Sequence, residues 1–504
     1  MKGLFIYYFT ALFILPVSVT AQRVTYSDYE KEDGLDMNFE IIGKMNGNFL
    51  VYKNSSWRHK LSIFDPEMKI KEIVKLDFIP EKTFNVDCIT YPGFFYMIYQ
   101  YQKKNILHCM GVKMDGDGKK ISEPVELDTT QVSIFAENKI YSTITSEDKQ
   151  RIMVFKIQKK YDRMNMVTLL FDNGLQLLKK SRLSMPYSER RNNYGDIMLD
   201  NEGNMVTTLA SQTYNREYNN DLTLIIKNAV QDSFSFHTLD LNKVYIDEVK
   251  LKIDNLNKRY LINALYYKKN NGNVEGLFSY SWDNFNAKGK VNTLTIFSDS
   301  LRDEARRDSR LRVAFDEFDL RQVIVKKDGG YLLMAEDVSV QSGLNNIYNR
   351  NNNYNSPYSI YPNSYYSYNP FYNDYYRPAS SFINQNKRYF YANILVFSMN
   401  KDGVAEWTRV IQKDQIDESQ DNFLSYFILN SGGELHFLYS IDKRNQIISD
   451  ESITPDGSVK RNPTLKSEEK GYQFMTRLSK QVGARQLLIP CQYRGYICFA
   501  KVDL

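Results

Sequence analysis

Hydrophobic and polar residues alternate through most of the chain, in short runs that are separated by tight polar turns. The run from Arg151 to Ile157 (RIMVFKI) shows this period of two, which is typical of a half-buried β-strand. Helical periodicity is almost absent, and only the charged stretch from Asp299 to Arg312 predicts a turn or two of helix. The pattern therefore predicts an all-β chain.

Two kinds of polar turn recur along the chain. Both are rich in Asp, Asn and Gly, and Gly and Asn adopt positive φ at little cost. The first kind ends one strand and begins the next, at Phe64–Glu67, Met114–Gly118, Phe171–Gly174, Met399–Gly403 and Thr454–Gly457, with weaker forms at Leu239–Asn242 and Phe297–Ser300. The second kind precedes a strongly apolar strand, at Asn46–Asn48, Glu202–Asn204, Asp328–Gly330 and Ser431–Gly433.

The two turns alternate with a cycle of about 50 to 65 residues, apart from one long gap, so that each cycle holds four short strands. Four-stranded antiparallel units that cannot bury both faces alone predict a β-propeller. A pair of β-sandwiches and a long β-solenoid are the competing architectures. Sandwiches do not explain repetition through the whole chain, and the coils of a solenoid are much shorter than this period.

The number of blades follows from counting the units. Seven units fit between about Asn38 and Lys466, and the remainder reads as three strands, at Tyr472–Ser479, Arg485–Tyr493 and Tyr496–Leu504. An N-terminal strand at Arg23–Tyr29 would supply the fourth and close the ring, which removes two exposed sheet edges. We expect one propeller domain over residues 22–504 with eight blades, and seven as the alternative.

The N-terminus has the parts of a cleavable secretory signal. Lys2 precedes an apolar run from Leu4 to Val19, and small residues stand at Val19 and Ala21. The run is shorter than the roughly 20 residues that a spanning helix needs, and Pro16 interrupts it. We expect a signal peptide at residues 1–21, no later membrane span, and an exported mature chain that is periplasmic or secreted.

Export permits disulfide bonds. If Arg494-Gly495 forms a two-residue hairpin turn, Cys491 and Cys498 lie directly opposite each other, at a distance that suits a disulfide. This pair is our disulfide candidate. Cys88 and Cys109 fall in strand-like runs and are expected to be buried thiols.

Three stretches carry a resemblance to a known group. They are Ser146–Phe155 (SEDKQRIMVF), Leu170–Leu178 (LFDNGLQLL) and Asn201–Asn204 (NEGN). They resemble the blades of uncharacterised exported propeller-like proteins of Bacteroidota, whose signals also end in a similar Thr-Ala-Gln. The resemblance covers most of the mature chain and rests on structural turns. It implies the fold and export, but no activity and no functional residue.

One segment, at about residues 343–388, breaks the pattern. Between Asn345 and Tyr376 it has ten Asn and ten Tyr, and only Arg350 and Asp374 are charged. A loop of this length inside a compact domain is either functional or disordered. One alternative is a solvated insertion between two strands of one blade, with no role. Another is a segment that mediates self-association. As a binding loop it would stack tyrosines on a partner, and the candidates are Tyr365, Tyr366, Tyr368, Tyr372, Tyr375 and Tyr376.

Charge and composition exclude several function classes. The 504 residues include 65 Lys and Arg and 60 Asp and Glu, and the net charge of +5 is spread along the chain, so no nucleic-acid partner is expected. The four histidines, His59, His108, His237 and His436, stand in separate units, which argues against a metal site. The run Asp115–Lys120 lacks the ligand pattern of a calcium loop and predicts a turn. No phosphate loop or dinucleotide motif is present, and no cofactor is expected.

The chain also lacks an assembled catalytic motif. Asp402–Trp407 approaches a sialidase box, but its glycine directly follows the aspartate, and no Gly-x-Ser-x-Gly nucleophile elbow occurs. Trp57 falls in a predicted connection, where it is either a binding anchor or packed over its own blade. We expect a non-enzymatic propeller that binds or scaffolds an envelope protein or a glycan. The alternative is a carbohydrate-active enzyme with paired carboxylates at the propeller mouth.

Overall fold

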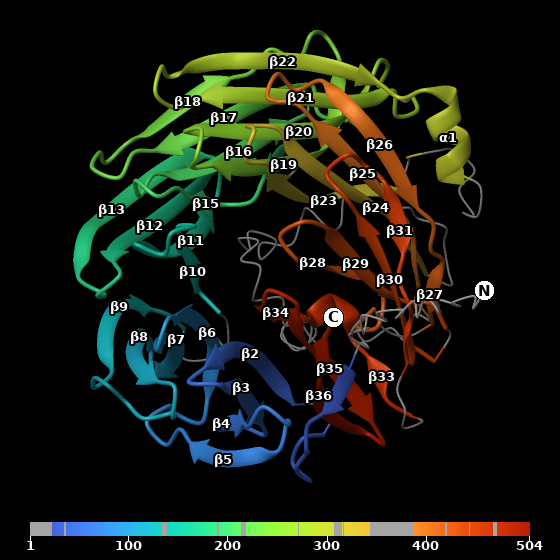
Figure 1. Cartoon of the computed structure of the whole chain (residues 1–504). Coiled ribbons are helices and arrows are strands. Elements are labelled where there is room, and N and C mark those ends of the chain that lie inside the picture. Colours follow the sequence, from blue (N-terminus) through green and yellow to red (C-terminus); the bar gives the residue numbers. More distant parts are fainter. Residues whose placement is uncertain are drawn as a thin grey trace, which may run out of the picture.

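The chain folds into an eight-bladed β-propeller (Figure 1). The computed structural model describes residues 23–34, 37–133, 139–188, 191–212, 218–270, 272–306, 315, 317–342, 387–418, 421–442, 444–466 and 471–504. The expectation of eight four-stranded antiparallel blades in a ring is confirmed.

Each blade begins with the strand nearest the ring centre and ends with the outermost strand. Blades are numbered in chain order. Blade 1 is β2 (Asn38–Met45), β3 (Asn48–Ser55), β4 (Arg58–Phe64) and β5 (Ile70–Lys75), and blade 2 is β6 (Thr83–Tyr91), β7 (Phe94–Lys103), β8 (Ile106–Asp115) and β9 (Val125–Gln131). Blade 3 is β10 (Tyr141–Thr145), β11 (Arg151–Lys160), β12 (Arg163–Asp172) and β13 (Leu177–Pro186), and blade 4 is β14 (Asn192–Tyr194) with β15 (Met198–Leu199), β16 (Met205–Ser211), β17 (Asp221–Lys227) and β18 (Phe234–Thr238).

Blades 5 to 8 complete the ring in the same order. Blade 5 is β19 (Tyr245–Asp254), β20 (Arg259–Tyr267), β21 (Gly276–Asp283) and β22 (Lys288–Ile296), and blade 6 is β23 (Phe318–Val325), β24 (Tyr331–Ser342), β25 (Lys387–Met399) and β26 (Ala405–Ile411), with β27 (Gln415–Asp417) beside β25. Blade 7 is β28 (Tyr426–Asn430), β29 (Leu435–Ser440), β30 (Ile447–Ile453) and β31 (Val459–Arg461), with β32 (Leu465–Lys466) beside β30. Blade 8 is β33 (Gln473–Phe474) with β34 (Lys480–Gly483), β35 (Gln486–Tyr493), β36 (Tyr496–Asp503) and β1 (Arg23–Tyr26).

The N-terminal strand closes the ring, as the sequence predicted. β1 pairs antiparallel with β36, from Arg23 opposite Asp503 to Tyr26 opposite Ala500. Tyr26 also stacks on Tyr472 with ring centroids 3.9 Å apart. The expected strand at Tyr472–Ser479 is wrong in detail, because a 3₁₀ turn at Thr476–Leu478 separates β33 from β34.

The connections divide the propeller into two faces. Turns between first and second strands and between third and fourth strands all emerge on one face, which we name the turn face. Hairpins between second and third strands and the crossovers between blades emerge on the opposite face, which we name the loop face. Both predicted turn motifs lie on the turn face. The weaker forms at Leu239–Asn242 and Phe297–Ser300 are instead crossovers on the loop face, so those two assignments are wrong.

Neighbouring blades are held together through the turns of the turn face. Backbone carbonyls of these turns accept hydrogen bonds from side chains of the preceding blade. Examples are Arg409 Nε to Gly457 O at 2.7 Å, Thr293 Oγ1 to Gly403 O at 2.9 Å, and Tyr96 Oη to Asn173 O at 3.1 Å. The recurring turn sequence therefore serves the contact between blades as well as the reversal of the chain.

A charged network joins blades 2 and 3. Asp128 accepts hydrogen bonds from Lys156 Nζ at 2.6 Å, Lys180 Nζ at 2.7 Å and Tyr141 Oη at 2.9 Å. Burial opposes the charged form of Asp128, but these partners lower its pKa below the usual value. Asp128 thus contributes stability as a carboxylate.

The helix α1 (Asp299–Arg306) lies in the crossover from blade 5 to blade 6, where the charged stretch predicted a helical turn. Asn393 of β25 donates to the Ala305 carbonyl at 2.7 Å, which fastens the end of the helix to the blade. Within the part of the chain that is described, no helix has the length and apolar character needed to cross a membrane.

Candidate binding site at the channel mouth

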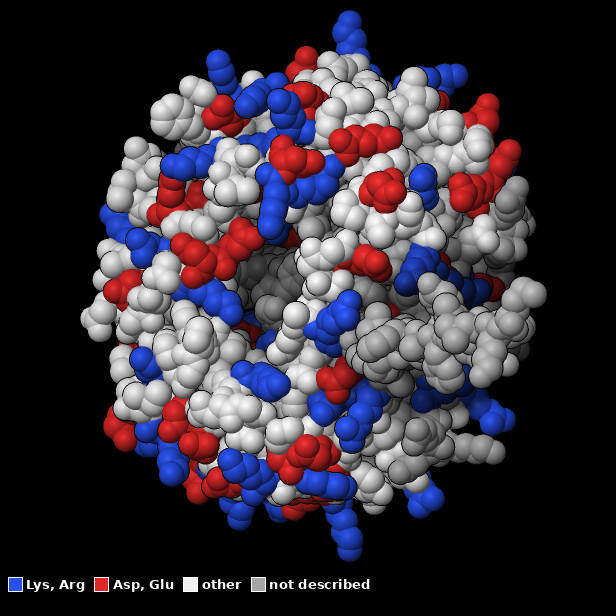
Figure 2. Space-filling model, in the orientation of Figure 1, with Lys and Arg blue, Asp and Glu red and all other residues white. Residues whose placement is uncertain are grey.

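The first strands of the blades surround the ring centre, where the space-filling view has a hollow bordered by side chains of both charges (Figure 2). Each first strand runs from the loop face to the turn face. Charged residues gather at or just before the starts of these strands, near the loop face. They are Glu40 of β2, Asp247 and Glu248 of β19, Asp319 and Arg321 of β23, Lys480 of β34, and Asp421 and Arg477 in the segments that precede β28 and β34.

Two of these first strands are bulged at their charged residues. The register of β23 shifts between Leu320 and Gln322, so that Arg321 is the extra residue. In β19 the register shifts between Asp247 and Lys250, and Glu248 has φ of +54°. Positive φ is strained for a residue other than glycine, and bulges commonly redirect side chains next to functional sites.

Arg321 is the centre of a group that we name the blade-6 charge cluster: Asp319, Arg321, Glu336, Asp337, Tyr391, Lys413, Asp421 and Arg477. Its Nε lies 3.2 Å from Glu336 Oε2, its Nη2 lies 3.5 Å from Asp319 Oδ2, and its guanidinium lies over the ring of Tyr391. Burial opposes the charged guanidinium, but the two carboxylates raise the pKa of Arg321. The side chain is nevertheless 35% exposed, so a ligand could reach a permanently charged donor.

Glu336 forms the floor of this cluster. Its Oε1 lies 2.8 Å from Lys413 Nζ, and both side chains are almost completely buried. Ser425 Oγ donates to Glu336 Oε2 at 2.6 Å. Burial lowers the pKa of Lys413, although Glu336 opposes that shift. The buried ion pair of Glu336 and Lys413 therefore fixes the position of Arg321, which contacts Glu336.

A second arginine extends the cluster toward blade 8. Arg477 Nη1 lies 3.0 Å from Asp421 Oδ2 and 3.2 Å from the hydroxyl of Tyr391, which itself donates to Asp421 at 3.0 Å. Burial works against the carboxylate of Asp421, but Arg477 and Tyr391 lower its pKa. Tyr391 thus lies between two arginines, with both guanidinium groups about 6 Å from its ring centroid.

Asp337 is the acid of the cluster with the most perturbed ionisation. Burial, and then the neighbouring charge of Glu317, raises its pKa to about 8. Asp337 is therefore mostly protonated at neutral pH and offers a neutral carboxyl group beside a set of permanent charges.

A further charged group joins blades 8, 1 and 2. Both carboxylate oxygens of Glu40 lie within 3.3 Å of the Cys88 backbone nitrogen, which donates to them. Lys480 Nζ donates to the carbonyls of Ile41 and Ile42 at 2.8 and 3.0 Å. Burial raises the pKa of Glu40 and lowers that of Lys480, and attraction between the two opposes both shifts.

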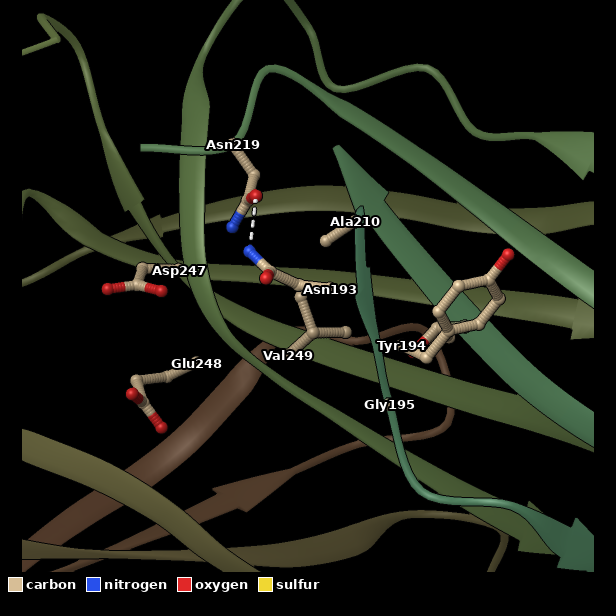
Figure 3. Close-up of a pocket in the computed structure, with 9 residues that line it drawn as sticks. Asn193, Tyr194, Gly195, Ala210, Asn219, Asp247, Glu248 and Val249 are labelled. Atoms are coloured by element: carbon tan, nitrogen blue, oxygen red, sulfur yellow. Dashed lines mark hydrogen bonds between the residues drawn. The ribbon is translucent and has the colours of Figure 1, made fainter. Parts of the chain in front are cut away.

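A small pocket lies between blades 4 and 5 (Figure 3). Asn193 Nδ2 donates to Asn219 Oδ1 at 3.1 Å within it, and Asp247 and Glu248 stand at one side. Its volume is about 10 Å³, which is room for about one water molecule. This pocket is too small to be a ligand site. Among the described residues, no group of three or more His, Cys, Asp or Glu side chains is placed to hold a metal ion.

Of the binding residues predicted from the sequence, the structure describes Trp57 but not the six tyrosines. Trp57 lies in the hairpin between β3 and β4 on the loop face, half-buried, with φ of +66° after Ser56 at +50°. The predicted tyrosines, Tyr365, Tyr366, Tyr368, Tyr372, Tyr375 and Tyr376, lie outside the described residues, as does the signal at residues 1–21. β24 and β25 connect through residues 343–386, so both ends of that segment are on the loop face.

Sequence reasoning missed the blade-6 charge cluster. Its members come from β23, β24, β25, the crossover before β28 and the 3₁₀ turn before β34, so no spacing along the chain connects them. One local signal was present. Glu336 and Asp337 directly follow the apolar run Tyr331–Ala335, and two adjacent acids that extend a buried apolar run suggest a special site.

Comparisons with known proteins give only remote likenesses. No protein-family model and no curated protein sequence matches the chain. Among solved structures, prolyl oligopeptidase B from Galerina marginata is 10% identical with a TM-score of 0.41, over 92% of this chain and 56% of that one. A eukaryotic initiation factor is 9% identical with a TM-score of 0.37, over 94% of this chain and 85% of that one. A polysaccharide lyase is 11% identical with a TM-score of 0.36, over 82% of this chain and 89% of that one. The chain spans little more than half the length of the oligopeptidase. Likenesses at this level carry no argument about activity.

Proposed function

We propose that this protein is an exported, non-enzymatic binding or scaffolding module of the cell envelope. Its partner is an envelope protein or a glycan, which binds on the loop face at the mouth of the central channel. The signal-like pattern of residues 1–21 and the resemblance to exported propellers of Bacteroidota support export.

The observation that carries this proposal is the blade-6 charge cluster. Arg321 is partly exposed and rests on the buried pair of Glu336 and Lys413, so its position is fixed before a ligand arrives. A preorganised guanidinium binds carboxylate or carbonyl oxygens with little loss of side-chain entropy. Tyr391, between the two arginines, is held by the same contacts.

Trp57 adds a second contact on the same face. Ser56 and Trp57 form the two-residue turn of this hairpin, in which positive φ is the usual backbone conformation, and the tryptophan side chain is half-buried there. The Tyr- and Asn-rich segment also starts and ends on this face. A partner that covers the channel mouth would meet these elements together.

The test uses the mature chain, Gln22–Leu504, on a glycan array and in pull-downs from envelope extracts. We compare wild type with Arg321→Gln and with Lys258→Gln, which removes the same charge from an exposed residue of the turn face. We expect capture by wild type and Lys258→Gln, and at least a tenfold weaker capture by Arg321→Gln. Equal capture by all three would contradict the proposed site. Because Arg321 contacts buried Glu336, unfolding curves are recorded for each variant, and Trp57→Gly provides a second loop-face variant.

A carbohydrate-active enzyme is the second candidate, and the raised pKa values of Glu40 and Asp337 favour it. Hydrolysis of a glycosidic bond needs two carboxyl groups about 5 to 10 Å apart. Glu40 and Asp337 belong to blades 1 and 6, which are not neighbours in the ring. Cleavage of a polysaccharide by wild type, lost in Glu40→Gln or Asp337→Asn, would replace the binding proposal with this one.

A further inference from the structure

We propose that Cys491 and Cys498 form a disulfide bond that cross-links β35 and β36 in blade 8, the last blade of the ring. The two residues pair directly across the hairpin of β35 and β36, and their Sγ atoms lie 3.2 Å apart. The hairpin turn is Arg494-Gly495, with φ of +50° and +84°, which fits the tight two-residue turn that sets this register. The inference concerns blade 8 and does not rest on the proposed partner.

The backbone distance suits the bond. Phe499 exchanges hydrogen bonds with Ser27, donating its N–H to Ser27 Oγ and accepting from Ser27 N, so its polar groups point away from β35. Because hydrogen-bonded and non-hydrogen-bonded pairs alternate along an antiparallel ladder, Cys491 and Cys498 are a hydrogen-bonded pair. Such pairs have Cα atoms about 5.5 Å apart, which is within the range of natural disulfides.

The bond forms by thiol–disulfide exchange. The thiolate of one cysteine attacks a sulfur of a small disulfide such as oxidised glutathione, giving a mixed disulfide and releasing one glutathione thiolate. The thiolate of the second cysteine then attacks the protein sulfur of that mixed disulfide and releases the second glutathione. The protein loses two protons and two electrons, and the electrons reduce one glutathione disulfide to two thiols.

Burial determines when this exchange takes place. Cys491 and Cys498 are 0% and 1% exposed, and burial raises the pKa of the Cys491 thiol. Exchange requires an accessible thiolate, so the bond must form before blade 8 is covered by β1 and the neighbouring blades. After closure the same burial shields the bond from reductants.

The other two cysteines provide an internal control. Cys88 of β6 lies opposite Met97, and Cys109 of β8 lies opposite Gln100 in one ladder and Asp128 in the other. Neither is opposite a cysteine, so both remain thiols. The fully oxidised chain therefore has two thiols and one disulfide.

The test counts thiols in the mature chain after refolding in a mixture of reduced and oxidised glutathione. The protein is quenched with acid, unfolded, alkylated and weighed by mass spectrometry. We expect two adducts per chain before reduction and four after it. Trypsin cleaves after Arg494, so the bridge should join two peptides that separate on reduction. Four adducts without reduction, or a linkage that includes Cys88 or Cys109, would overturn the proposal.

A variant and a native-state measurement complete the test. Cys491→Ser should give three adducts without reduction, and this count holds even if the variant folds poorly, because labelling is done in denaturant. Folded oxidised wild type should resist dithiothreitol for at least tenfold longer than the urea-unfolded chain. Equal rates of reduction would contradict the shielding by blade closure. None of these results depends on export or on partner binding, so the binding proposal stands or falls separately.

Discussion

Gly457 lies flat against the indole ring of Trp407. Gly457 belongs to the outer turn of blade 7, and Trp407 belongs to β26, the outer strand of blade 6. A Cβ atom at Gly457 would come within 2.7 Å of Trp407 Cδ2, and the residue also has φ of +84°. The turn glycine therefore satisfies two demands at once, one from its own backbone and one from the neighbouring blade.

Gly457→Ala should destabilise the propeller by about 2 to 4 kcal/mol, the sum of the strain of positive φ and the overlap with the indole ring. Gly432→Ala is the matched control, because Gly432 has φ of +89° but a Cβ atom added there would meet nothing within 4 Å. It should cost only about 1 kcal/mol. Urea unfolding of both variants measures the difference, and equal losses would show that packing against Trp407 contributes nothing.

Deletion of residues 22–26 should lower the melting temperature and promote self-association. β1 supplies the outer strand of blade 8, and its loss exposes the edge of β36 and the packing sites of Val24 and Tyr26. An unpaired edge strand is a template for association with other chains. Calorimetry and size-exclusion chromatography measure both effects. Arg23→Ala, at an exposed position of the same strand, should leave both unchanged; a deletion that behaves like this control would refute ring closure by β1.

Trp57→Gly should separate stability from binding. Glycine adopts positive φ without strain, so the free energy of unfolding should be at least as high as in wild type. Capture of the partner should fall at least tenfold, because a tryptophan in a hairpin on the loop face would be lost. A large loss of stability would instead indicate that Trp57 packs over its own blade and is not a binding anchor.

Asp337 should make the protein less stable as the pH rises. Its pKa is about 8 in the folded state and about 3.9 in an unfolded chain, so between these values the folded protein holds a proton that the unfolded chain has released. The resulting stability is present near pH 4 and is lost progressively as the pH approaches 8, by up to about 1.4 kcal/mol per pH unit.

Asp337→Asn removes this proton while keeping the shape of the neutral acid. The free energy of unfolding of the variant should therefore fall less steeply than that of wild type between pH 5.5 and pH 8. Urea titrations at three pH values measure both slopes. Glu123→Gln, at an exposed position, should retain the wild-type slope. Parallel curves for wild type and Asp337→Asn would show that Asp337 is charged in the folded protein.

The fold could be predicted from the sequence because its signals are local. Alternation of apolar residues defines strands, and turns such as Met399–Gly403 recur between the third and fourth strands of blades 1, 2, 3, 6 and 7. Local signals also misled. Leu239–Asn242 has the composition of a turn, yet its strands belong to different blades, and Thr476–Leu478 interrupts a strand without any Gly or Pro. In both places the contact with a neighbouring blade decided the structure.

The candidate site could not be predicted in this way. Arg321, Tyr391 and Arg477 meet only because blades 6, 7 and 8 are adjacent in the ring. A single sequence does not show which residues of different blades are in contact. The bulge at Arg321 likewise has no distinctive local sequence, since a register shift depends on the partner strand.

The most direct test of the account is hydrogen–deuterium exchange of the mature chain with and without its captured partner. We expect added protection on the loop face, at the starts of β23 and β28, around Arg477 and at the Ser56-Trp57 hairpin. Turns of the turn face, including Gly403 and Gly457, should exchange at unchanged rates. Protection confined to the turn face, or none at the channel mouth in a saturated complex, would contradict the central claim that this propeller binds its partner at the loop-face end of its channel.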